Sequence, residues 1–213
     1  MPTVEDAVAR PRGTKGNKSR KGPMKTVSIF GSSLPHEGTA AYDEARTLGR
    51  LLAEAGLAVC NGGYGGLMEA SARGAGEAGG HTVGITCTLW PSAANRWIAE
   101  EVRTKSFLER LTTLIERGDA YVVLPGGTGT LAELALVWEM MNKSTLSKTV
   151  GGRKPLLVMV PYWQPVVECL NQEASLGGDI GPPFQRRPRA MEIVHLMTDV
   201  GAVAAHLKTA LAG

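Results

Sequence analysis

The chain has 213 residues, of which 43% are hydrophobic, 20% charged and 5% aromatic, and its formal net charge is +3. These ordinary globular values exclude collagen-like, low-complexity and wholly disordered chains, and the length suits one domain with a tail. No apolar run approaches the roughly 18 residues of a membrane-spanning helix, so we expect no membrane partner. No secretory signal is recognisable, and three widely spaced cysteines give no disulfide or zinc pattern, so we expect a cytoplasmic protein.

The basic character lies at the start of the chain. Residues 1–25 carry seven Lys or Arg and two acidic residues, a net charge of +5, whereas the rest carries 16 basic and 18 acidic residues, a net charge of −2. Because this segment has almost no apolar residues to bury, we expect a disordered basic tail. It is either an arm for nucleic acid or an extension without a binding role, since Met24 could itself be the start. We expect no other contact with nucleic acid.

From residue 26 onwards, short apolar runs alternate with helical patterns. The apolar runs predict buried strands at residues 26–30, 57–60, 81–86, 120–125, 154–161 and 193–197. Apolar residues at helical spacing predict helices at residues 40–55, 67–78, 106–117, 131–141, from 166 to 170 and at 200–211. A Gly- and Pro-rich stretch at 177–189 predicts a loop. The alternation predicts an α/β fold, a single Rossmann-like domain over residues 26–213 with a parallel sheet and helices on both faces.

Three of the expected strands end in glycine-rich turns. The turns are GSS (31–33), NGGYGG (61–66) and PGGTGT (125–130). Ligands of parallel α/β sheets lie beyond the carboxyl ends of the strands, so the three turns should meet at one edge. We predict substrate contacts from the first two turns, at residues Gly31, Ser32, Ser33, Gly62 and Gly63. Met68 and the tryptophans, Trp90 among them, are assigned to the core or to an interface.

The third turn carries the strongest signal for a ligand. Its glycines let backbone N–H groups face a concavity, and a helix follows directly, so the amides and the helix dipole favour an anion. Two threonines add hydroxyl donors. We predict a phosphate site made by residues Gly126, Gly127, Thr128, Gly129 and Thr130. No Lys-Ser or Lys-Thr pair follows, so nothing indicates a Walker loop or Mg-dependent hydrolysis of a nucleoside triphosphate.

Two charged residues flank this turn. Glu133 is expected in the first turn of the following helix, where a carboxylate is also common for dipole reasons alone. Beside a bound ribose phosphate, however, it could stabilise an oxocarbenium-like transition state or orient water. Arg110 lies 23 residues before Glu133. By itself it is one cation on a helix, but its side chain suits bidentate binding of phosphate or carboxylate.

These segments together resemble the Lonely Guy family, whose founding members are cytokinin-activating phosphoribohydrolases. The resemblance covers about residues 26–200 and rests on PGGTGTLAEL (125–134), Arg110 upstream, GSS after the first strand and GGYGGLM (62–68) after the second. It implies that Arg110 and Glu133 are catalytic and that residues 126–130 bind phosphate. The implied protein is a homodimer that hydrolyses the N-glycosidic bond of a nucleoside 5′-monophosphate, a small-molecule nucleotide, without a metal or organic cofactor.

The chain departs from the family pattern at three places. Leu111 replaces the Lys that usually follows the catalytic Arg, Ala132 replaces a second carboxylate, and Tyr64 interrupts the glycines of the second turn. These changes favour AMP, or another purine or N6-modified monophosphate, over the plant hormone. They also support the alternative of a non-catalytic carrier or sensor of a phosphorylated ligand, such as a nucleotide or a molybdopterin-type cofactor.

Overall fold

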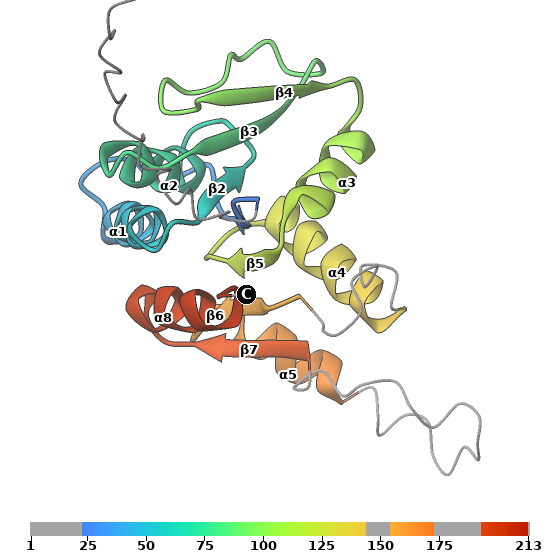
Figure 1. The fold of residues 1–213 in the computed structure, drawn as a ribbon. Helices are drawn as coiled ribbons and strands as arrows, with labels where there is room; N and C mark the ends of the chain where they lie inside the picture. The colour runs from blue at the N-terminus through green and yellow to red at the C-terminus, as the bar shows by residue number, and fades with distance from the viewer. Residues whose placement is uncertain (1–22, 144–153, 173–192, 213) are drawn as a thin grey trace, which may run out of the picture.

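The computed structural model describes residues 23–143, 154–172 and 193–212, which form an α/β fold (Figure 1). The strands are β1 (Thr26–Phe30), β2 (Ala58–Asn61), β3 (Thr82–Cys87), β4 (Glu100–Thr104), β5 (Ala120–Val123), β6 (Leu156–Met159) and β7 (Val194–Met197). The helices are α1 (Ala40–Glu54), α2 (Leu67–Glu77), α3 (Phe107–Arg117), α4 (Thr128–Asn142), α5 (Gln164–Asn171) and α8 (Val200–Ala210). The expected loop at 177–189 and nearly all of the expected basic tail lie outside the described residues.

All strand pairs of the seven-stranded sheet are parallel, which confirms the predicted fold class. The strand order is β4-β3-β2-β1-β5-β6-β7. The central strand β1 therefore pairs with β2 on one side, where Val27 lies opposite Val59, and with β5 on the other, where Val27 lies opposite Ala120. The chain changes direction across the sheet at this strand, and such a switch point is where open α/β sheets bind ligands.

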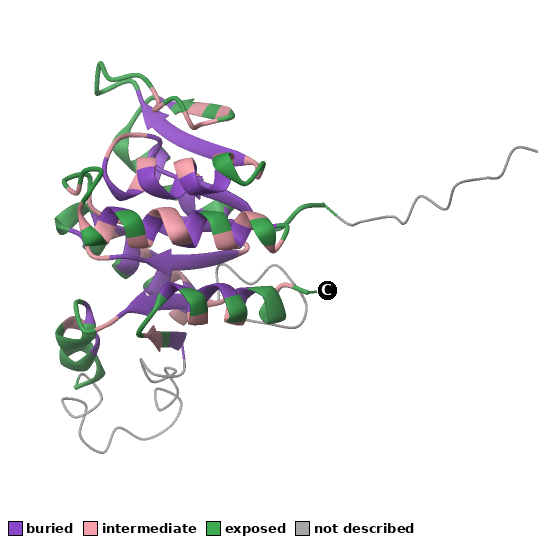
Figure 2. Ribbon diagram, turned by 90° about the vertical axis from the view of Figure 1, so that its left-hand side faces the viewer, coloured by how far each residue is buried: buried purple, intermediate pink, exposed green. Residues whose placement is uncertain are grey.

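Helices cover both faces of the sheet, as predicted. In Figure 1, α1, α2 and α8 lie to one side of the strands, and α3, α4 and α5 to the other. Alternate residues of β1 supply the two cores: Val27 and Ile29 belong to the cluster under α1 and α8, whereas Phe30 packs in the cluster under α3 and α4. The strands are accordingly buried on both faces in the middle of the sheet (Figure 2). Among the described helices, none has the length and apolarity needed to cross a membrane.

One strand and the start of one helix differ from the sequence-based expectation by more than two residues. The strand β4 was not predicted, because its sequence EEVRT is charged and only its last residue is buried, as suits an edge strand. Helix α4 begins at Thr128 and not at residue 131. Glu133 therefore lies in the second turn of α4 and not in the first, which weakens the helix dipole as a reason for a carboxylate at this position.

Candidate functional site

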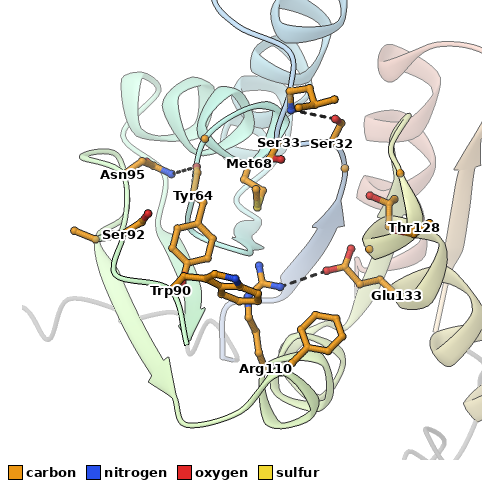
Figure 3. Close-up of a pocket in the computed structure, with 18 of the residues that line it drawn as sticks. Ser32, Ser33, Tyr64, Met68, Trp90, Ser92, Asn95, Arg110, Thr128 and Glu133 are labelled. Atoms are coloured by element: carbon orange, nitrogen blue, oxygen red, sulfur yellow. Dashed lines mark hydrogen bonds and ion pairs between the residues drawn. The ribbon is translucent and has the colours of Figure 1, made fainter. Parts of the chain in front are cut away.

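A cavity of about 730 Å³ lies beyond the carboxyl ends of the central strands (Figure 3). It brings together most of the residues that the sequence nominated. Those that line it are Gly31, Ser32, Ser33, Arg110, Gly127, Thr128, Gly129, Thr130 and Glu133. The three glycine-rich turns thus meet at one edge of the sheet, as expected from the topology.

Three other nominated glycines, Gly62, Gly63 and Gly126, do not line the cavity. A side chain at Gly62 would collide with the Arg110 guanidinium, so this glycine makes room for the arginine behind the cavity wall. Gly63 has a positive φ of 78°. At Gly126 a Cβ would collide with Thr130. Gly62 and Gly126 thus leave space for two residues that line the cavity, Arg110 and Thr130.

The amino-terminal end of α4 presents free amides to the cavity. Its N-cap is Gly127, which offers no side-chain oxygen, whereas α3 and α8 are capped by the side chains of Ser106 and Asp199. The first helical bond runs from the Leu131 amide to the Gly127 carbonyl, 3.0 Å away. Within the described part of the chain, no hydrogen bond acceptor takes up the amides of residues 127–130. Such an uncapped helix start stabilises an anion.

The Arg110 side chain is buried and held from several directions. Its Nε donates to the Ile85 carbonyl at 2.8 Å, and its Nη2 donates to the Gly62 carbonyl at 3.2 Å. Its guanidinium lies 5.6 Å from the ring centres of both Tyr64 and Trp90. Because these contacts fix the guanidinium plane, the remaining nitrogen, Nη1, is presented to the cavity, on the side where Figure 3 shows Glu133.

Glu133 faces Arg110 across the cavity. The closest ion-pair distance, from Arg110 Nη1 to Glu133 Oε1, is 3.9 Å, which is too long for a hydrogen bond. Burial raises the pKa of the Glu133 carboxyl from its ordinary value to about 7, and the Arg110 charge lowers it only in part. A carboxyl group with this pKa can hold or release a proton near neutral pH, which is what acid–base chemistry requires.

The raised pKa of Glu133 predicts a pH-dependent gain in stability for Glu133→Gln. The folded protein keeps this carboxyl protonated up to about pH 7, whereas the unfolded chain ionises it above about pH 4.5. The free energy of unfolding of the wild type therefore falls across this range, while the neutral glutamine avoids the loss. Urea unfolding should show a benefit of Glu133→Gln that is about 2–3 kcal/mol larger at about pH 8 than at about pH 5.

Glu116→Gln is the control for this stability prediction, because Glu116 is an exposed carboxylate on a helix, α3. Its effect on the free energy of unfolding should change by no more than a few tenths of a kcal/mol between the two pH values. If the benefit of Glu133→Gln is the same at both pH values, the Glu133 carboxyl is not held protonated by burial.

Aromatic side chains form the end of the cavity opposite the α4 amides. Tyr64 and Trp90 meet edge to face with ring centres 5.8 Å apart, and Trp90 meets Phe107 in the same way at 6.2 Å. The Tyr64 hydroxyl accepts the Cys87 amide at 2.9 Å, which ties this wall to the end of β3. Met68 and Trp90 both line the cavity, whereas the sequence analysis assigned them to the core or to an interface.

The sequence contained a signal for this aromatic wall. Tyr64 stands within the second glycine-rich turn, and Trp90 follows β3, a fourth strand whose carboxyl end reaches the same edge. For metal binding the described residues offer nothing comparable, since they contain no group of three or more His, Cys, Asp or Glu side chains that could hold an ion.

Similar proteins are found both by sequence and by fold. Residues 24–153 match the SLOG cluster4 family. The cytokinin riboside 5′-monophosphate phosphoribohydrolase of Rhodococcoides fascians is 30% identical over 183 residues, 83% of this chain and 88% of that protein. A protein of the same name from Mycobacterium tuberculosis is 33% identical over 141 residues, 65% of this chain and 71% of that protein. The molybdenum cofactor binding protein of Rippkaea orientalis aligns with a TM-score of 0.65 and 20% identity, over 88% of this chain and 98% of that one.

Proposed function

Since the chain belongs to the SLOG cluster4 family, with relatives that bear out its resemblance to the Lonely Guy proteins, we propose that it is a nucleoside-5′-monophosphate phosphoribohydrolase. It hydrolyses the N-glycosidic bond of AMP or an N6-modified relative and releases the free base and ribose 5-phosphate. The observation that carries this proposal is the pairing of Arg110 with Glu133, 3.9 Å apart, beside the uncapped start of α4.

The phosphate-binding residues lie at the start of α4, and the carboxylate lies one turn further along. The amides and hydroxyls of residues 127–130 hold the 5′-phosphate, and this anchor fixes the ribose. Glu133 then faces C1 of the ribose, where positive charge develops as the bond to the base lengthens. In its ionised form it stabilises that charge and accepts a proton from the water that attacks C1.

The base departs as its bond to C1 breaks, and the electron pair of that bond leaves with it. A proton from solvent or from the site neutralises the base. Arg110 presents Nη1 to the cavity and can stabilise the negative charge on the phosphate or on the departing base. The aromatic wall of Tyr64, Trp90 and Phe107 offers flat apolar surfaces on which a purine stacks.

We further propose that the protein acts as a homodimer in the cytoplasm. Leu34, which lines the cavity, is 85% exposed, and the sequence neighbours of the lining residues Trp90 and Phe107 are exposed as well, Leu89 by 61% and Leu108 by 71%. Exposed leucines of this size favour contact with a protein partner over contact with solvent. Light scattering on the purified protein measures the subunit number, and a monomer at all concentrations would contradict the homodimer.

Purified protein incubated with a panel of monophosphates tests the proposed reaction. AMP, GMP, CMP, UMP and an N6-substituted AMP are compared, and the free base is followed by chromatography. We expect base release from AMP or its N6-substituted form, and none from Glu133→Gln. If no monophosphate releases a base but one of them raises the melting temperature, the protein is a carrier or sensor. The Rippkaea orientalis neighbour does not decide this point, because 20% identity establishes a shared fold only.

A further inference from the structure

We propose that Tyr162, which lies outside the cavity, is a positioning residue for the phosphate-binding turn. It holds the Gly126 carbonyl away from the cavity and thereby aims the Gly127 amide into it. This role rests on one part of the proposed function, the binding of a phosphate group in the cavity. Nothing in the sequence pattern nominated Tyr162, which follows β6 and lies 36 residues after Gly126.

The carbonyl groups of the turn between β5 and α4 are each held by a different partner. The Leu124 carbonyl accepts the indole Nε1 of Trp163 at 2.9 Å. The Pro125 carbonyl accepts the Ser32 amide at 3.0 Å. The Gly126 carbonyl accepts the Tyr162 hydroxyl at 2.7 Å. With the Gly127 carbonyl bound by the α4 amide of residue 131, four consecutive carbonyls are engaged.

The anchored Gly126 carbonyl also fixes the direction in which the Gly127 amide points. The peptide unit is planar and trans, so the C=O of Gly126 and the N–H of Gly127 point in opposite directions. The residue that follows this peptide bond, Gly127, lines the cavity, whereas Tyr162 does not. A carbonyl drawn outward by Tyr162 therefore leaves the amide facing the ligand.

This peptide bond needs an anchor because glycines flank it. Without a Cβ on either side, Gly126 and Gly127 can rotate to place the carbonyl in the cavity at little steric cost. An inward carbonyl oxygen would repel a phosphate and would remove one of its donors. Each of the other carbonyls of the turn is held by a backbone amide or a buried indole, whereas the Gly126 carbonyl depends on one tyrosine hydroxyl.

Tyr162 is itself held in place from the core. Its ring packs edge-on against Trp163, with ring centres 5.1 Å apart, and Trp163 is only 4% exposed. Tyr162 is 53% exposed, so its hydroxyl is not part of the core and folding should depend on it only weakly. Removal of the hydroxyl alone therefore separates positioning of the turn from stability.

The test compares Tyr162→Phe with Tyr121→Phe. Both variants lose one hydroxyl that donates to a backbone carbonyl, but Tyr121 donates to Ile115 and Gly118, away from the cavity. Calorimetric titration with inorganic phosphate should show binding weakened about 3- to 10-fold in Tyr162→Phe. Tyr121→Phe should bind phosphate as the wild type does. With AMP, Tyr162→Phe should raise KM by the same factor and leave kcat unchanged, because the phosphate is held equally in the ground and transition states.

The alternative outcomes are distinct. If Tyr162→Phe binds inorganic phosphate as tightly as the wild type, or lowers kcat with no change in affinity, Tyr162 does not position the turn. If both tyrosine variants weaken phosphate binding equally, the effect is a general loss of stability and the inference fails. If the wild type binds phosphate but releases no base, the proposed hydrolase activity fails, whereas the difference between the two tyrosine variants still tests the role of Tyr162.

Discussion

Glu133→Gln is expected to lower kcat for base release by about 100-fold or more while phosphate binding is retained. The glutamine keeps the size of the side chain but cannot accept a proton from water and carries no charge to face C1. The phosphate turn contains no group that depends on Glu133, so inorganic phosphate should bind the variant and the wild type alike. Single-turnover base release and calorimetric titration with phosphate measure the two effects separately.

The pH dependence provides a second test of Glu133. In the proposed mechanism the ionised carboxylate is the active form, so wild-type kcat/KM should rise with pH and level off above about pH 7, where burial places the pKa of the Glu133 carboxyl. Substrate phosphate also ionises near pH 6. The pH dependence of AMP binding to Glu133→Gln isolates that contribution. If kcat/KM falls as the pH rises through 7, Glu133 acts as an acid and the assigned direction of proton transfer is reversed.

Sequence patterns predicted correctly those parts of the fold that a single general rule determines. The buried strands follow from near-continuous apolar runs, and the meeting of three turns follows from a parallel sheet. They failed at β4, because this strand is mostly charged, lies at the edge of the sheet and buries little. They also placed the start of α4 too late. Thr128, Gly129 and Thr130 are poor helix formers, and contacts to the preceding turn from the segments that follow β1 and β6 outweigh that propensity.

Within the cavity, the charged pair and the aromatic wall were not equally predictable. Arg110 and Glu133 were nominated from their place relative to one glycine-rich motif. Trp90 and Phe107 come from two separate segments, a loop after β3 and the start of α3, and neither has a spacing that indicates their contact. Tyr162 reaches the turn between β5 and α4 from the segment that follows β6. Long-range contacts of this kind depend on strand order, which local periodicity does not encode.

Arg110→Ala is expected to reduce turnover by about 100-fold or more, because both the charge of the guanidinium and its fixed place in the cavity are lost. The variant removes the cation from the cavity and leaves the Ile85 and Gly62 carbonyls without their donor. It also removes the positive charge that lowers the pKa of the Glu133 carboxyl, so that pKa should rise above about 7. The rise of kcat/KM should therefore shift to higher pH in addition to the loss of rate.

Arg110→Lys and Arg117→Ala separate position from charge. Arg117 lies on the same helix with its side chain 45% exposed and pairs with Glu100, so its removal should leave turnover within about twofold. A lysine at position 110 keeps the charge, but its donors all lie on one nitrogen, which cannot take the separate places of Nε at Ile85, Nη2 at Gly62 and Nη1 near Glu133. Arg110→Lys should therefore remain severely impaired, although its pH profile should lie closer to that of the wild type than the profile of Arg110→Ala.

Added guanidinium ion distinguishes a missing group from a collapsed cavity. The space left by Arg110→Ala lies between the aromatic rings of Tyr64 and Trp90 and the carboxyl of Glu133. A planar guanidinium ion can bind the two aromatic rings by cation–π attraction and the Glu133 carboxylate by its charge. It should therefore restore part of the lost turnover in Arg110→Ala and none in Glu133→Gln. Near-normal turnover in both Glu133→Gln and Arg110→Ala would refute the assignment of the pair. Among the described residues that line the cavity, Arg110 and Glu133 are the only charged side chains, so no other could replace them in the proposed reaction.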